Sequence, residues 1–172
     1  MKNPSTFSAN SHIAVIGNTQ TGHHYWIGRC ADGSEHYAGQ TFKSYKAGQL
    51  KNIRIFAEMI VGKTDALLSV FEFDPDTREW KEKKGECVLS LDKTYEKQWV
   101  SFDMQNIPVD NRKHYAFKIS CNHGGMMAIG ECSWKQQDPY PDGEEWIASS
   151  INPKGKFHRN FDLSFVAEIA YN

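Results

Sequence analysis

Alternation of apolar and polar residues recurs along most of this 172-residue chain, and it limits the possible folds more than any other feature. Residues 115–121 read YAFKISC and residues 161–171 read FDLSFVAEIAY, with an aromatic or aliphatic side chain at nearly every second position. Because successive side chains of a β-strand point to opposite faces of a sheet, this pattern predicts strands buried on one face. Helical periodicity is nearly absent, and its best candidate, 55–61, ends after two turns at Gly62.

Clusters of turn-forming residues separate the expected strands, for example at 46–48 and 74–76. The turn 122–125 (NHGG) predicts a hairpin that pairs the strand before it with the strand after it. The expected strands are 50–56, 67–73, 87–91, 99–104, 115–121, 126–132 and 161–171, with weaker candidates at 12–16, 24–30 and 36–43.

The number and spacing of these strands predict an all-β fold, a two-sheet antiparallel jelly-roll β-sandwich. No helices alternate with the strands, which excludes a parallel βαβ sheet. The length suits one domain. We expect residues 12–172 to form a single β-sandwich domain and the polar residues 1–11 to form a flexible N-terminal arm. In the last strand, Phe161, Leu163 and Phe165 are expected in the core, with Asp162 and Ser164 facing the other way or capping the sheet edge.

Charge and hydropathy exclude several classes of partner. Lys and Arg number 20 against 21 Asp and Glu, a formal net charge of -1, so no nucleic-acid partner is expected. The apolar run 13–16 is shorter than the ~7–15 residues of a signal-peptide core, and no stretch reaches the ~20 residues of a membrane-spanning helix. We therefore expect no membrane insertion. Met1 favours a leaderless protein, whereas a mature or excised module would be located at the cell surface or outside it.

The four cysteines stand at positions 30, 87, 121 and 132, without the short C-x₂₋₄-C spacing of a zinc site. In the predicted hairpin, Cys121 lies opposite Met126 and Cys132 lies opposite Tyr115. The two thiols would then be about ten residues apart at ~3.3 Å each, too far for a disulfide. The sequence predicts four free thiols, mostly buried as small apolar groups.

From Ala38 onward, the order of several motifs resembles a galactose-binding-like jelly-roll module of bacterial surface, secreted and phage-related proteins. The motifs that carry the resemblance are GQTF (39–42), GQL (48–50), IRI (53–55), QWVSF (98–102), IPV (107–109), HYAFKI (114–119), the aromatic block 134–146 and FDLSF (161–165). The chain departs from the pattern at Asn111-Arg112-Lys113, where a glycine-containing turn is usual, and at Gly143-Glu144-Glu145, where small residues are usual. The resemblance implies a non-catalytic appendage that binds carbohydrate or takes part in assembly.

The segment 134–146 (WKQQDPYPDGEEW) is the strongest candidate for a binding site. Its two prolines and its glycine predict an irregular loop. Aromatic rings can stack on the apolar faces of sugars, and carboxylates accept hydrogen bonds from sugar hydroxyls. Alternatively, the aromatic rings fold inward and hold the loop over an open end of the sandwich. The candidate ligand-binding residues are Trp134, Asp138, Tyr140, Asp142 and Trp146.

Metal-binding patterns are weaker. The adjacent His23 and His24 point to opposite faces of a strand, so a shared transition-metal site with His12 and His36 is only a minor alternative. The acidic turns 32–35 and 74–77 suit either ordinary turns or a structural Ca²⁺. No other cofactor is expected.

Catalytic motifs are missing, since the sequence holds no G-x-S-x-G, H-E-x-x-H or phosphate-binding loop. We do not expect an enzyme. The leading hypothesis is a non-catalytic carbohydrate-binding module, and the alternative is a structural module in a cell-surface or phage-like assembly. The partner would be a glycan or a protein surface. A polysaccharide-active enzyme of the jelly-roll type is the least favoured hypothesis, because it needs two facing carboxylates that the sequence does not place.

Overall fold

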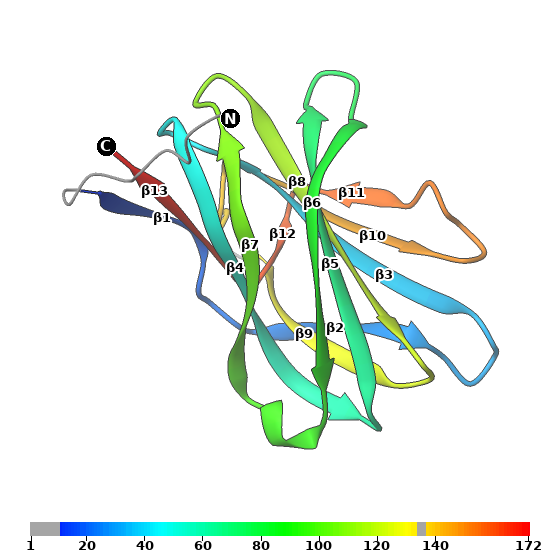
Figure 1. The fold of residues 1–172 in the computed structure, drawn as a ribbon. Helices are drawn as coiled ribbons and strands as arrows, with labels where there is room; N and C mark the ends of the chain where they lie inside the picture. The colour runs from blue at the N-terminus through cyan, green and yellow to red at the C-terminus, as the bar shows by residue number, and fades with distance from the viewer. Residues whose placement is uncertain (1–10, 134–136) are drawn as a thin grey trace.

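The computed structural model describes residues 11–133 and 137–172, and these form an all-β fold with one short 3₁₀ helix (Figure 1). Among the described residues, no helix has the length and apolar character needed to cross a membrane. The elements are β1 (His12–Asn18), β2 (His23–Arg29), β3 (Glu35–Lys43), β4 (Gly48–Val61), β5 (Thr64–Asp74), β6 (Glu79–Leu91), η1 (Lys93–Tyr95), β7 (Gln98–Val109), β8 (His114–Asn122), β9 (Met126–Ser133), β10 (Glu145–Ser149), β11 (Lys156–His158), β12 (Phe161–Leu163) and β13 (Phe165–Tyr171).

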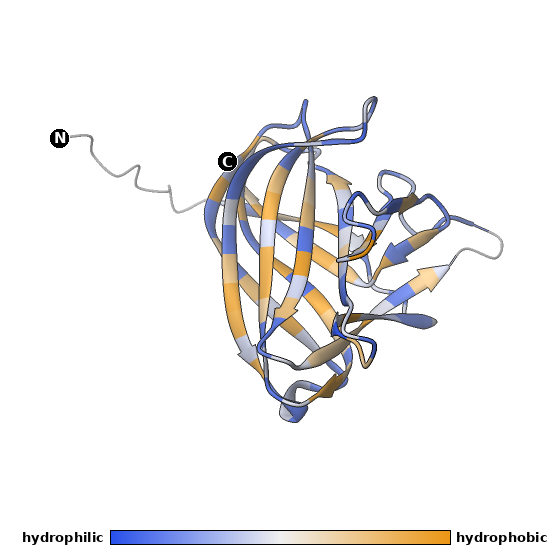
Figure 2. Ribbon diagram, turned by 90° about the vertical axis from the view of Figure 1, so that its right-hand side faces the viewer, coloured by the Kyte–Doolittle hydropathy of each residue, from blue (hydrophilic) through white to orange (hydrophobic). Residues whose placement is uncertain are grey.

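The strands pair antiparallel in the order β1-β13-β4-β9-β2-β3-β8-β5-β6. Off this path, β7 pairs with β4, and β12 pairs with β9. Strand β10 pairs with both β3 and β11. This sheet curls over on itself, so that two layers enclose one core (Figure 2). We call β1, β13, β4, β7, β9 and β2 the β4 layer, and β10, β3, β8, β5 and β6 the β8 layer. The predicted all-β antiparallel sandwich is confirmed, with both layers formed by one continuous curled sheet.

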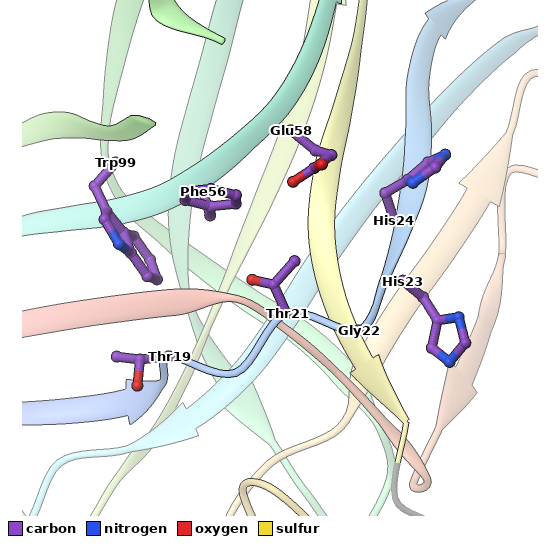
Figure 3. A pocket seen from close by; sticks show the side chains of 8 residues that line it. All are labelled: Thr19, Thr21, Gly22, His23, His24, Phe56, Glu58 and Trp99. Carbon is purple, nitrogen blue, oxygen red and sulfur yellow. The ribbon is translucent and has the colours of Figure 1, made fainter. Parts of the chain in front are cut away.

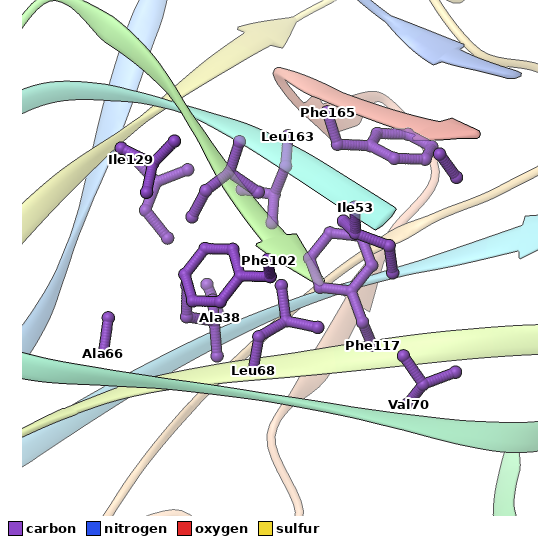
Figure 4. Close-up of a cluster of buried hydrophobic side chains, with 14 of the residues drawn as sticks. Ala38, Ile53, Ala66, Leu68, Val70, Phe102, Phe117, Ile129, Leu163 and Phe165 are labelled. Atoms are coloured by element: carbon purple, nitrogen blue, oxygen red, sulfur yellow. The ribbon is translucent and has the colours of Figure 1, made fainter. Parts of the chain in front are cut away.

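Both layers supply the core through alternate residues, as the sequence pattern predicts. Ile53, Phe102 and Phe165 come from the β4 layer, and Leu68 and Phe117 come from the β8 layer (Figure 4). The rings of Phe117 and Phe165 meet across the core with centroids 5.7 Å apart. Aromatic contact between the layers adds to the burial of apolar surface, which is the main stabilising term.

The predicted hairpin at 122–125 is wrong. Strand β8 lies between β3 and β5, whereas β9 lies between β2 and β4, so the turn leads from one layer to the other. His123 and Gly124 have φ angles of 64° and 82°, which suits a tight turn whether it joins two paired strands or two layers. Alternation tells which face of a strand is buried but not which strand is its neighbour. The four cysteines are nevertheless free, as predicted, although Cys121 alone is fully buried.

Two expected elements differ in extent. The helical candidate 55–61 is the second half of β4, whose alternation is interrupted by a bulge between Ala57 and Met59. The expected last strand is divided at Ser164 into β12 and β13. Ser164 is buried, donates its N–H to the carbonyl of Gly130 at 2.7 Å and accepts from the N–H of Phe56 at 3.1 Å, so it joins three strands.

The residues around this break follow the prediction in part. Leu163 and Phe165 are fully buried, but Phe161 is only half-buried. Asp162 points away from the apolar core, as expected, yet it is buried beneath the segment that leads into β10. Strands β10 and β11 were not expected, because the two prolines before them suggested an irregular loop.

Candidate functional site

The structure places two of the three predicted aromatic residues of the loop, Tyr140 and Trp146, inside the protein. Trp134 lies outside the described residues, and Tyr140 and Trp146 are only 7% and 2% exposed. The Tyr140 ring meets Phe165 edge-on at 5.3 Å, and the Trp146 ring lies 5.1 Å from Trp80. The Trp146 Nε1–H donates to the carbonyl of Lys154 at 3.0 Å. Tyr140 and Trp146 therefore pack beneath the segment, as the inward alternative predicts, and neither offers a free ring face.

The two predicted aspartates do come together, at a pocket of about 400 Å³ near the loop. Asp138 accepts from the backbone N–H of Tyr140 at 3.0 Å, and Asp142 accepts from the hydroxyl of Tyr45. On the same pocket, Glu144 accepts from Arg78 at 2.9 Å and from Arg159 at 2.8 Å. The carboxylates on this pocket are thus already hydrogen-bonded, and neither Tyr140 nor Trp146 is among the residues that line it.

A cluster of acidic side chains lies inside the sandwich behind this pocket. Asp162 accepts from Gln40 Nε2 at 2.7 Å and from the Tyr140 N–H at 3.0 Å, and burial raises the pKa of Asp162 to about 8. Burial also raises the pKa of Glu145 and of Glu131, and each carboxyl group affects the pKa of the other. The low polarity of the interior disfavours the ionised form of these carboxyl groups.

The acidic turns and His36 are engaged in local hydrogen bonds. Asp32 accepts from the Ser34 N–H at 2.9 Å, and Asp74 accepts from the Asp76 N–H at 3.0 Å. His36 bonds to the hydroxyl of Tyr25 and to that of Ser34, both at 3.1 Å. Within residues 11–133 and 137–172, no group of three or more His, Cys, Asp or Glu side chains is arranged to hold a metal ion. A structural Ca²⁺ stays a prediction.

A different site, which the sequence analysis did not single out, lies on the solvent side of the β4 layer. Phe56 of β4 and Trp99 of β7 are directly paired across the two strands, and their ring centroids are 5.5 Å apart. Both rings are half-buried and border a hollow of about 370 Å³, which we call the aromatic hollow (Figure 3).

Polar groups surround the two rings. Glu58 and Thr21 lie between the Phe56–Trp99 pair and His24 (Figure 3). Glu58 accepts from Lys97 Nζ at 3.0 Å, and the Thr21 hydroxyl contacts the Ser164 hydroxyl at 2.8 Å. The turn 19–22 between β1 and β2 thus closes one side of the aromatic hollow. A carboxylate, a hydroxyl and an imidazole can all hydrogen-bond to a polar ligand seated on the rings.

Strand phase explains why these aromatics face outward. In β4, Ile53 and Ile55 point into the core, so Phe56 points to the opposite side. In β7, Val100 and Phe102 are buried, which directs Trp99 outward. The alternation in the sequence shows that Trp99 lies on the face opposite to Val100. It does not show that Phe56 of β4 becomes the neighbour of Trp99.

A second hollow, of about 490 Å³, lies on the same surface of β4 and β7, and we call it the polar hollow. Asn52 and Asp103 are paired across the two strands there, and Arg54 and Ser101 form a pair between the polar and the aromatic hollow. At ~3.3 Å per residue, the four-residue step from Asn52 to Phe56 corresponds to about 13 Å. The polar hollow is lined by Lys51, Asn52, Ser101, Asp103, Gln105 and Asn106.

Comparisons with known proteins give no family and no function. No protein-family model and no curated protein matches the chain. A structure of the Gx strain of infectious bursal disease virus overlaps 99% of this chain and 45% of the viral chain, with 8% identity and a TM-score of 0.39. A mutant VP2 protein of that virus overlaps 95% of this chain and 40% of its own, with 8% identity and a TM-score of 0.37.

A Gt strain structure of the same virus overlaps 98% of this chain and 43% of its own, with 7% identity and a TM-score of 0.37. The chain therefore spans less than half the length of these viral chains. The strand pairing described above establishes an all-β fold in which a curled antiparallel sheet encloses the core. Neither the galactose-binding-like family in particular nor a bacterial origin is identified, and function has to be argued from the site.

Proposed function

We propose that this protein is a non-catalytic binding module that holds a carbohydrate at the aromatic hollow of the β4 layer. The observation that carries the proposal is the pair of half-exposed rings, Phe56 and Trp99, bordered by Glu58, Thr21 and His24. A sugar presents an apolar C–H face that can lie on such rings and hydroxyl groups that can bond to such neighbours.

The expected affinity is low. By analogy with aromatic pairs, each ring contact contributes ~1 kcal/mol, and a few hydrogen bonds bring the total to ~4–6 kcal/mol. This corresponds to dissociation constants of about millimolar to high micromolar. Such a module works by retention on a surface or on a multivalent polymer rather than by tight capture of a single sugar.

The position of the buried carboxyl pair supports a non-catalytic role. A glycosidase holds two carboxyl groups ~5–9.5 Å apart around a substrate bond. Glu131 and Glu145 are only 8% and 2% exposed, so this carboxyl pair is not open to a sugar.

Replacing Trp99 by leucine is expected to weaken retention on carbohydrate about fivefold or more, because ~1 kcal/mol of ring stacking is lost. Leucine keeps an apolar side chain against Phe56 and should preserve the fold. The measurement is affinity electrophoresis through gels containing soluble polysaccharides, with the melting temperature of each variant recorded beside it.

Tyr45→Ala is the matched control, since Tyr45 is an exposed aromatic residue that contacts Asp142 at the loop pocket instead. Retention of this variant should equal that of the unmodified protein. If Tyr45→Ala loses retention and Trp99→Leu keeps it, the ligand binds at the loop pocket with Asp138 and Asp142. If the unmodified protein is retained by no polysaccharide, the carbohydrate proposal is wrong.

A second candidate function, assembly with another protein subunit, is favoured by the open edge of β1. This strand pairs with β13 on one side and with no other strand among the described residues. Ile13 and Val15 are 52% and 60% exposed on it, and residues 12–18 (HIAVIGN) contain no lysine, arginine or acidic residue. Another outer strand, β6, carries three lysines at 81, 83 and 84, which is the usual protection of an edge against pairing.

If β1 is an assembly edge, Val15→Lys is expected to abolish self-association, because it places a charge in a strand pair. Sedimentation velocity across a range of protein concentrations measures this. Val88→Lys, at an equally exposed valine on β6, should leave association unchanged. A protein that stays monomeric at every concentration would exclude pairing of two copies through β1.

A further inference from the structure

We infer that the ligand of the aromatic hollow is an uncharged, extended polysaccharide chain that lies along β4 and β7 and reaches the polar hollow. The inference rests on the proposed function and specifies the class of ligand for the same site. Its basis is the juxtaposition of two hollows on one strand pair, with unpaired polar atoms and balanced charge on the surface between them.

The two hollows form a continuous strip on the outer side of β4 and β7. The cross-strand pairs Phe56–Trp99, Arg54–Ser101 and Asn52–Asp103 follow one another along the same face. Ser101, the β7 residue between the two hollows, is exposed and has a small side chain. A compact ligand would fill one hollow, whereas an extended chain is needed to contact both.

Polar atoms without a hydrogen-bond partner are concentrated on this strip. Five buried side-chain atoms lack a partner among the described residues, and three belong to β4: Gln49 Oε1, Asn52 Oδ1 and Arg54 Nε. Arg54 Nη2 donates to Glu168 at 2.7 Å and Asn52 Nδ2 donates to Glu168 at 2.9 Å, so Glu168 occupies one end of each side chain.

An unpaired polar atom that is shielded from water costs free energy. These three atoms are shielded from solvent in the unliganded protein. A ligand can pair with them only when the half-buried side chains turn outward, and it then has to supply both donors and acceptors. Sugar hydroxyls donate and accept hydrogen bonds, so a chain of sugars can satisfy an amide oxygen and a guanidinium N–H along one path. An apolar ligand would leave all three atoms unpaired.

The charges along the strip favour an uncharged ligand. Three carboxylates and three cations border it, and they form pairs such as Arg54–Glu168 at 2.7 Å and Lys97–Glu58 at 3.0 Å. An acidic polysaccharide would gain from the cations and be repelled by the carboxylates in similar measure, while giving up its own hydration. The charged groups are Lys51, Arg54, Lys97, Glu58, Asp103 and Glu168.

The test is calorimetric titration with cello-, xylo- and manno-oligosaccharides from disaccharide to hexasaccharide, beside oligogalacturonides of the same lengths. At least one neutral series should bind, with affinity rising about tenfold from disaccharide to hexasaccharide as the chain reaches the polar hollow. Ser101→Ile should remove this gain and leave the disaccharide affinity unchanged, because a stiff β-branched side chain obstructs the path yet suits a strand. Ser90→Ile, at an exposed serine of β6, is the matched control and should behave as the unmodified protein.

The outcomes separate the inference from the proposed function. The extended path would be overturned if the affinity for neutral oligosaccharides did not depend on their length. It would also be overturned if Ser101→Ile kept the increase of affinity with length. In both cases the aromatic hollow would still be a sugar site. Tighter binding of oligogalacturonides that weakens with salt would overturn the uncharged class. Absence of binding by every series, with the fold intact, would overturn the proposed function itself.

Discussion

Phe165→Ala is expected to lower the free energy of unfolding by about 3–5 kcal/mol, the range for a large-to-small change at a fully buried aromatic residue. The Phe165 ring is inaccessible to solvent and lies 5.7 Å from Phe117, 6.3 Å from Phe42 and 5.3 Å from Tyr140. Alanine would leave a cavity where the two layers meet beneath the loop. Urea denaturation followed by tryptophan fluorescence measures the change.

The matched control for this cavity is Val88→Ala, which shortens an apolar side chain that is 56% exposed on β6. Its effect should stay within ~0.5 kcal/mol, as for surface substitutions in general. A cost below ~1 kcal/mol for Phe165→Ala would contradict the shared core of the two layers.

Glu145→Gln is expected to stabilise the protein at pH 8 and to reduce the dependence of its stability on pH. Burial raises the pKa of Glu145 well above its usual range, and hydrogen bonding to Glu131 acts in the same direction. The folded state therefore keeps a proton that the unfolded chain releases above pH ~4.3. Each such group lowers the free energy of unfolding by up to ~1.4 kcal/mol per pH unit until the folded pKa is reached.

Glutamine has the same shape, cannot ionise, and can donate its amide N–H to the Glu131 carboxylate. The variant should accordingly lose up to ~1.4 kcal/mol per pH unit of slope between pH 5 and 8, measured by urea denaturation at several pH values. Some slope should remain, because burial also raises the pKa of Asp162, to about 8. Glu144→Gln, at the adjacent carboxylate that faces the loop pocket, is the control and should keep the original slope. An unchanged slope for Glu145→Gln would mean that Glu145 is ionised in the folded protein.

Local physical chemistry was sufficient to predict the fold class and most strand positions. The alternation in 99–104 and 115–121 requires one buried face, and β7 and β8 indeed bury the predicted residues. The free thiols were also predicted correctly, although the hairpin used to argue for them does not exist. The prediction of which face is buried is unaffected by the wrong strand pairing, because it depends on each strand alone.

Binding-site geometry was less accessible from the sequence, because it depends on which strands become neighbours. The loop residues Tyr140 and Trp146 are as apolar and aromatic as a sugar platform requires, but the layers close over them. Conversely, Trp99 was visible as an outward residue, and only its pairing with Phe56 of β4 makes a platform of it. The same aromatic residue types occur in cores and at binding sites, so the packing around each residue decides its role.

The sequence by itself determined that this chain forms an antiparallel sandwich with one buried face per strand, since side-chain period and turn chemistry act over a few residues. Only the tertiary structure decided that β8 and β9 belong to different layers, that Glu144 faces the loop pocket while Glu145 is buried, and that two hollows share one surface of β4 and β7. These outcomes depend on contacts between residues far apart in the chain. Their free energy comes from burial and pairing in three dimensions, which no local pattern specifies.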